Sequence, residues 1–182
     1  MDVVIRQAER SDVPAMLRLV KELAVFEREP SAVEVSEEEM ADAGFGERPV
    51  WFGWVAEMLV ASGEWRVASE RTQVTSGEWR VASEKSGSLS GGVLGMAICY
   101  ERYSTWKGRT LYLEDLVVKE SVRGKRIGER LFQECVRYAE RIGYGSIRWQ
   151  VLDWNVDAIR FYERLGGEVS GGWLNGSFMI ER

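Results

Sequence analysis

The feature that most constrains the fold is a long apolar strand followed at once by a glycine-containing loop and an amphipathic helix. Residues 109–119 (RTLYLEDLVVK) have the composition of a strand, and residues 121–128 form the loop. A helix is then expected to run to residue 142, because apolar residues recur along it at helical spacing: Leu131, Cys135, Ala139 and Ile142. Such a unit predicts a sheet with a helix packed against it.

Further elements are expected on both sides of this unit. Strands are predicted at residues 3–6, 49–57, 93–100 and 146–152, with a terminal strand or hairpin at 169–180, and helices start near residues 12, 36 and 155. Ser36 followed by Glu39 is a capping-box pattern that marks the start of the second helix. The order predicts a mixed α/β sheet flanked by helices, and the 182 residues fit a single domain over 1–182.

A duplicated segment interrupts the first half of the chain. The nine residues 62–70 (SGEWRVASE) recur unchanged at 76–84. Two copies are too few for a solenoid, which needs about three repeats or more. The alternation within each copy favours a strand–loop–strand insertion at about 59–91 between two strands. A mobile surface loop is the alternative, because the run at 86–92 (SGSLSGG) is typical of a flexible linker.

Composition excludes several kinds of chemistry. The chain has no histidine, which rules out Ser-His-Asp and Cys-His catalysis and removes the commonest zinc ligand. Its two cysteines, Cys99 and Cys135, have no metal-ligand spacing and are expected to be reduced core thiols, so we expect no metal site. The net charge of −5 disfavours nucleic acid as a partner and agrees with a cationic substrate. With no signal peptide and no apolar run near the ~18 residues of a membrane span, we expect a cytoplasmic protein without membrane association.

Two adjacent acids interrupt the apolar strand. Neighbouring strand residues point to opposite faces, so Glu114 and Asp115 cannot both reach solvent if both faces are covered. A charge in such a strand favours a functional role. The alternative is that the strand bends or bulges and both acids reach water.

The loop after this strand has the character of a phosphate-binding site. Its residues 123–128 (RGKRIG) combine cations and glycines directly before a helix N-terminus, which presents free amides and a partial positive charge. It lacks the lysine-serine pair of an ATP-binding loop, so a diphosphate of another kind is expected. The alternative is an ordinary solvated basic loop.

A third group of residues follows the strand predicted at 146–152. Asn155 is a natural helix cap, and Tyr162 lies further along the same helix. By itself Tyr162 fits a core aromatic as well as a functional one.

In combination these motifs resemble the GNAT acetyltransferase superfamily. YLEDLVV, VRGKRIG and DWNVDAIRFYERLG stand in that family's order and spacing, over residues 1–58 and 92–182. Within the family the chain is most similar to the diamine (spermidine/spermine-type) and thialysine acetyltransferases, as residues 5–29, 42–49 and 103–115 indicate. The resemblance implies a three-layer fold with a central mixed, splayed β-sheet, acetyl-coenzyme A as the acyl donor, and a homodimer.

The resemblance also implies roles for individual residues. Tyr162 would protonate the departing thiolate, Glu114 would accept the proton of the amine, and the Leu116 amide would donate to the thioester carbonyl. The implied cofactor contacts are Leu116, Val117, Val118, Arg123, Gly124, Lys125, Arg126, Ile127, Gly128, Glu129, Asn155, Asp157, Ala158 and Tyr162. The implied substrate contacts are Phe26, Glu27, Glu114, Asp115 and Trp173.

Three departures from the family pattern shape the expected function. Arg126 stands where the family usually has glycine, and it keeps its backbone amide available if its φ is negative. Ser104 and Gly171–Gly172 replace acids of the polyamine enzymes, so a shorter diamine or an amino acid with a side-chain amine is the expected acceptor.

The sequence therefore predicts direct acetyl transfer from acetyl-coenzyme A to a primary amine of a small molecule. The alternatives are acetylation of a protein lysine or N-terminus, and a non-catalytic module that binds acyl-coenzyme A.

Overall fold

The computed structural model describes residues 2–59, 90–172, 174–178 and 180, and these form two compact units. The first unit runs from Met1 to Arg148 and the second from Trp149 to Arg182. The predicted insertion at 59–91 lies almost entirely outside the described residues, as does Trp173.

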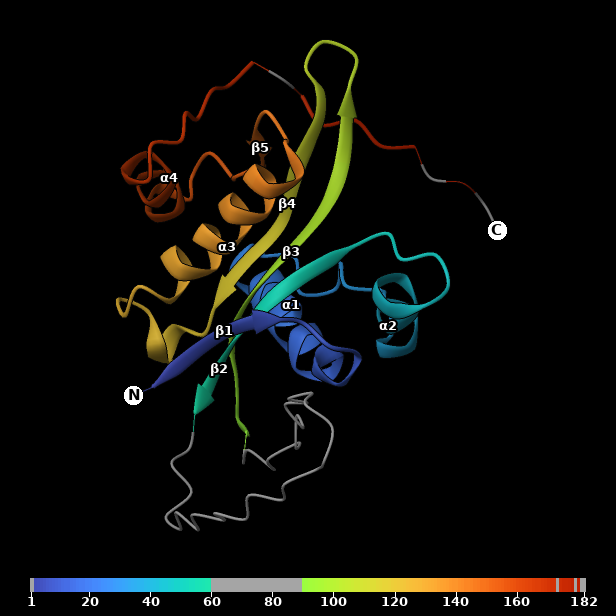
Figure 1. Cartoon of the computed structure of the whole chain (residues 1–182), viewed down its shortest axis with the longest axis vertical. Helices are drawn as coiled ribbons and strands as arrows, with labels where there is room; N and C mark the ends of the chain where they lie inside the picture. Colours follow the sequence, from blue (N-terminus) through green and yellow to red (C-terminus); the bar gives the residue numbers. More distant parts are fainter. Residues whose placement is uncertain (1, 60–89, 173, 179, 181–182) are drawn as a thin grey trace, which may run out of the picture. The chain divides into compact units, whose positions relative to one another are not determined.

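The first unit is built on one mixed sheet in the order β1-β2-β3-β4-β5 (Figure 1). Its strands are β1 (Val3–Gln7), β2 (Phe52–Leu59), β3 (Ser90–Ser104), β4 (Gly108–Val118) and β5 (Ile147–Arg148). Its helices are α1 (Val13–Phe26), α2 (Glu37–Phe45) and α3 (Ile127–Ile142). Neighbouring strands are antiparallel except β4 and β5, which are parallel, and this confirms the predicted mixed α/β sheet.

Helices cover both faces of this sheet. On one face α1 and α2 bury Met16, Leu19 and Met40 against Val55 and Met96 of the strands. On the other face α3 packs through Cys135, whose Sγ lies 3.7 Å from the Sγ of Cys99. Both thiols are buried and free, as expected. The result is the predicted three-layer arrangement of helix, sheet and helix.

Local signals explain where the helices start. At α2 the hydroxyl of Ser36 accepts the Glu39 amide at 3.1 Å, while the Glu39 carboxylate accepts the Ser36 amide at 2.9 Å, so the capping box is confirmed. Asp12 precedes α1 but makes no side-chain cap bond to that helix. Its carboxylate instead accepts from Arg6 at 2.7 and 2.8 Å, which ties the start of α1 to β1.

Some predicted elements differ in length. β3 begins earlier and ends later than the predicted 93–100, and β5 has only two residues instead of the expected 146–152. The terminal strand or hairpin predicted at 169–180 was wrong, because the described part of that segment forms no strand. A strand needs a neighbour to satisfy its backbone, and the described part of this segment pairs with none of the strands of the sheet. Ile142, expected in the core, is 47% exposed at the last turn of α3.

The second unit contains α4 (Val156–Arg164), which confirms the helix predicted to start near residue 155. Asn155 is its N-cap, and the side-chain oxygen of Asn155 accepts the Ala158 amide at 3.2 Å. None of the helices in the described ranges is both long and apolar enough to span a membrane.

Candidate active site

A β-bulge in β4 places the two acids of the strand. Ile98 of β3 pairs with Asp115, but the next residue, Cys99, pairs with Leu113, so Glu114 is the extra residue on its strand. Glu114 is exposed, while Asp115 remains partly covered. The alternative of a bulged strand is therefore correct for the backbone, although only Glu114 reaches solvent freely.

Three carboxylates crowd one side of the sheet. Burial, together with the charges of Glu114 and Glu27, raises the pKa of Asp115 to about 6 from its ordinary 3.8. Glu27 follows the end of α1, and partial burial raises its pKa also. Because each charge opposes the others, this cluster has a net attraction for a cation.

Two tyrosines that sequence reasoning did not single out lie beside this cluster. Tyr100 of β3 pairs with Tyr112 of β4, and their rings are tilted by 33° with centroids 5.0 Å apart. Burial first, and then the charge of Glu114, raises the pKa of both hydroxyls. The spacing of two residues between Ile98 and Tyr100 places both side chains on one face of β3. Placing that face beside Asp115 requires the register between β3 and β4, which the sequence does not specify.

Arg102 continues the same row of β3. Its guanidinium lies 5.4 Å from the centre of the Tyr112 ring, and its charge opposes that of Glu114 in setting the pKa of both tyrosines. The face therefore runs from Glu27 and the two strand acids, across a pair of aromatic rings, to a cation.

A cavity of about 490 Å³ lies beside the end of β4. It is lined by Phe26, Val117, Val118 and Arg123, all of them predicted site residues, together with Glu22, Leu23, Val25 and Glu120. The guanidinium of Arg123 lies 5.8 Å from the centre of the Phe26 ring, and its Nε donates to the Val118 carbonyl at 3.2 Å. Arg123 thus connects the end of α1 to the loop that follows β4.

The predicted phosphate loop has two residues in the left-handed region. Gly124 has a φ of 77° and Arg126 a φ of 59°, directly before α3 begins at Ile127. The condition of a negative φ at Arg126 is therefore not met, and this arginine adopts a conformation that glycine prefers. A Cβ at Gly124 would meet nothing within 4 Å, so the surface above the loop is open.

This loop fits a diphosphate group. Lys125 and Arg126 are exposed, and neither has an ion pair within the part of the chain that the structure describes. Left-handed residues directly before a helix N-terminus help to form an anion-binding concavity. These residues could hold the pyrophosphate of coenzyme A.

The strand next to the cavity has an open edge. Within the first unit, β4 pairs with β5 only at Leu111 and Tyr112, so Leu116, Val117 and Val118 have no β5 partner there. Within the first unit this leaves backbone groups of β4 without a strand partner on that side and available to a ligand.

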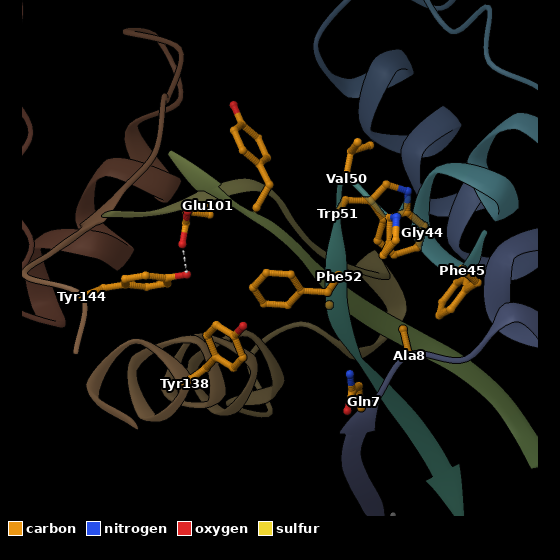
Figure 2. A pocket seen from close by; sticks show the side chains of 13 residues that line it. Gln7, Ala8, Gly44, Phe45, Val50, Trp51, Phe52, Glu101, Tyr138 and Tyr144 are labelled. Carbon is orange, nitrogen blue, oxygen red and sulfur yellow. Dashed lines mark hydrogen bonds between the residues drawn. The ribbon is translucent and has the colours of Figure 1, made fainter. Parts of the chain in front are cut away.

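A larger cavity lies elsewhere in the first unit and contains none of the predicted site residues. It measures about 720 Å³, and aromatic side chains such as Phe52 and Tyr138 line it (Figure 2). The Tyr144 hydroxyl donates to Glu101 at 2.7 Å across its wall, and burial raises the pKa of Tyr144 to about 12. Glu101 neighbours Tyr100 on β3 and so points to the opposite face, toward α3.

The remaining predicted residues lie in the second unit. Tyr162 is buried, and its ring stacks on Trp149 with centroids 4.5 Å apart. Asp157 is exposed in the first turn of α4, and the Ala158 amide is occupied by Asn155. The ring of Tyr162 therefore packs as a core aromatic would, and a role as general acid would be carried by its hydroxyl group.

Comparison with known proteins identifies the family. Residues 62–167 match the model of the Acetyltransferase (GNAT) family. The chain is 36% identical to the thialysine N-epsilon-acetyltransferase of Mus musculus, over 96% of this chain and 91% of that protein. It is 26% identical to the L-ornithine N5-acetyltransferase NATA1 of Arabidopsis thaliana, over 93% of this chain and 81% of that one.

Solved structures show the same fold. The crystal structure of the aminoglycoside acetyltransferase meta-AAC0020, from an uncultured soil metagenomic sample, has a TM-score of 0.66 and covers 98% of this chain and 97% of its own at 12% identity. More than half of the chain matches the family model, and the first unit has the open-edged strand β4 followed by the loop before α3. The chain belongs to the GNAT acetyltransferase family and is an acetyl-coenzyme A-dependent N-acetyltransferase.

Proposed function

We propose that this enzyme transfers the acetyl group directly to a primary amine of a small molecule. The observation that carries the proposal is the bulge at Glu114, which gathers Glu114, Asp115 and Glu27 on one face of the sheet. The acceptor class is a diamine or polyamine-like molecule, or an amino acid with a side-chain amine.

The chemistry of the acceptor requires such a cluster. A free alkyl amine has a pKa of about 10.4, so near neutral pH it is almost entirely protonated and not nucleophilic. Carboxylates first attract the ammonium, and one of them must then accept its proton, directly or through a water molecule. Glu114 is exposed at the bulge and takes this second role, while Asp115 and Glu27 hold the cation.

The donor side uses β4 and the loop after it. The Leu116 amide is proposed to donate to the thioester carbonyl as negative charge develops there, while Val117 and Val118 contact the pantetheine arm. Residues 123–129 bind the pyrophosphate, and Asn155, Asp157 and Ala158 flank the far arm of acetyl-coenzyme A. Tyr162 donates the proton that the leaving thiolate takes up, so no covalent enzyme intermediate is required.

The two relatives compared above support a small amine. Their names give thialysine and L-ornithine as acceptors, and both molecules carry a side-chain amine. Ser104 and Gly171–Gly172, which replace acids of the polyamine enzymes, favour an acceptor shorter than spermine.

Further properties belong to the same proposal. Residues 1–182 form one acetyltransferase domain with an inserted segment at about 59–91, and Trp173 contributes to the acceptor pocket. The enzyme works in the cytoplasm as a homodimer and uses no metal ion.

Turnover of acetyl-coenzyme A with a panel of amines tests the proposal. Release of the free thiol of coenzyme A should be rapid with a diamine or a basic amino acid and slow with a lysine peptide. Glu114→Gln should lower kcat/KM by about 10²–10⁴-fold, the range for removal of a general base. Glu101→Gln is the matched control, because Glu101 lies on the same hairpin but faces α3, and it should leave turnover unchanged.

Two results would redirect the assignment. Acetylation of peptides with no turnover of any free amine favours the protein acetyltransferase. Binding of acetyl-coenzyme A without turnover of any acceptor favours the non-catalytic module.

A further inference from the structure

Arg102 is a cation on the face that gathers the acids. In β3, Ile98, Tyr100 and Arg102 are spaced two residues apart and therefore share one face. Ile98 pairs with Asp115, and Tyr100 pairs with Tyr112, so this is the face of the carboxylate cluster. β2 pairs with β3 only as far as Cys99, and the stretch that carries Arg102 extends past it (Figure 1).

The guanidinium of Arg102 is not neutralised by the protein. It is exposed and lies over the ring of Tyr112, and among the described residues no carboxylate lies within ion-pair distance of it. Arg109 on the same hairpin differs, because it pairs with Glu101 at 3.5 Å on the face of α3. Arg102 thus keeps its hydrogen-bond donors free for a ligand.

The distance between the two charged ends suits an extended small molecule. Arg102 pairs with Thr110, four residues before Glu114, which is ~13 Å along the strand at about 3.3 Å per residue. Because the guanidinium lies over Tyr112, two residues closer to Glu114, the gap between the charged groups is shorter than the backbone gap. The rings of Tyr100 and Tyr112 lie between them and offer an apolar floor for a methylene chain.

We propose that Arg102 binds a carboxylate of the acceptor, so that the enzyme selects amines that carry an acid group at the far end of the chain. The acceptor then lies with its reactive amine at the Glu114 cluster, its methylenes over the two tyrosines and its carboxylate on Arg102. Guanidinium and carboxylate match each other in a two-bond geometry, whereas a second ammonium at that end would be repelled. This inference rests on the proposed function and narrows it to one acceptor chemistry.

Pairs of substrates that differ only in the carboxylate test the inference. Ornithine and 1,4-diaminobutane form one pair, and lysine and 1,5-diaminopentane form the other. Lysine amide serves as a third probe, because it keeps the shape of lysine but has no acid group. We expect kcat/KM to be higher for each acid than for its matched diamine, and higher for lysine than for lysine amide.

The variants Arg102→Gln and Arg102→Glu identify the residue responsible. Arg102→Gln should raise KM for the two amino acids about tenfold, since hydrogen bonds to charged groups are the strong ones and this site is open to water. It should lower the KM for the diamines, because the cation that repels their second ammonium is removed, and it should leave the KM for acetyl-coenzyme A unchanged. Arg102→Glu should reverse the order within each pair, and Arg109→Gln is the control that should preserve it.

The outcomes separate the two proposals. If Arg102→Gln lowers kcat/KM equally for the amino acids and the diamines, or lowers it for neither, the role of Arg102 is overturned while the acetyl transfer stands. A preference of the unaltered enzyme for diamines over the matched amino acids would overturn it as well. The absence of turnover with every free amine would refute the proposed function and this inference together.

Discussion

Replacing Arg126 tests whether the loop before α3 is strained. Its φ of 59° and ψ of 18° lie in the left-handed region, where a residue with a Cβ destabilises the folded state by about 1–2 kcal/mol. This destabilisation applies to arginine and to alanine but not to glycine. Glycine in turn gains about 0.4–1 kcal/mol of conformational freedom in the unfolded chain. The free energy of unfolding of Arg126→Gly should therefore exceed that of Arg126→Ala by about 0.5–1 kcal/mol.

Both variants lose the same guanidinium, so their difference reports the backbone alone. For a chain of this size, 1 kcal/mol corresponds to about 2–4 °C in Tm. Thermal and urea unfolding should place the glycine variant about 1–4 °C above the alanine variant, by the same scale. The KM for acetyl-coenzyme A should rise equally in the two variants, because both remove one cation from the proposed pyrophosphate site.

Lys125 provides the matched control. It is adjacent to Arg126 and is not among the residues with positive φ. At this position glycine only adds freedom to the unfolded chain, so Lys125→Gly should be less stable than Lys125→Ala. Equal stability of Arg126→Gly and Arg126→Ala, or the order found at Lys125, would refute the left-handed conformation and the strain argument.

Three further predictions concern Asp115, Tyr162 and the insertion. Because the folded pKa of Asp115 is raised to about 6, the contribution of its protonated form to stability is complete below about pH 4 and is lost as the pH rises through 6. Asp115→Asn should remove this loss and raise the free energy of unfolding at pH 7.5 by on the order of 2–3 kcal/mol, measured by urea titrations at several pH values. Tyr162→Phe keeps the ring that stacks on Trp149, so it should lower kcat about 10²–10⁴-fold without changing the Tm, and an unchanged kcat would make Tyr162 a packing residue. Leu59 and Ser90 are paired, so a short turn in place of residues 60–89 should leave an active enzyme, since loop length costs only about 0.6 kcal/mol per doubling; collapse of the thermal transition would contradict this.

Much of the fold was predictable because its signals are local. The capping box at Ser36 and the glycine at residue 143 mark helix ends by their own backbone chemistry. α3 was predicted within its observed bounds, because its apolar residues recur at helical spacing. The sequence shows that Arg126 stands where the family usually has glycine. It does not show that the φ of Arg126 is positive.

The arrangement of the acceptor face depends on strand register, which the sequence does not specify by itself. Nothing local distinguishes a bulge at Glu114 from a regular strand, because the register shift arises from how β4 pairs with β3. Without that register, Arg102 on β3 cannot be assigned to the face of Asp115. The prediction of a terminal strand failed for a related reason, because a strand depends on a pairing neighbour that the segment's own sequence does not specify.

The pattern of charge on one face, more than the total of −5, decides which acceptor the enzyme favours. Burial first, and then repulsion from Glu114 and Glu27, raises the pKa of Asp115 in the free protein. An ammonium among these acids relieves the repulsion, so binding is favoured most where the acids are closest together. Arg102 lies over the ring of Tyr112, and its charge lowers the pKa of the two tyrosines that Glu114 raises. A molecule with charges of opposite sign at its two ends therefore satisfies both ends of the face, whereas a molecule with two ammonium groups satisfies one end and is opposed at the other.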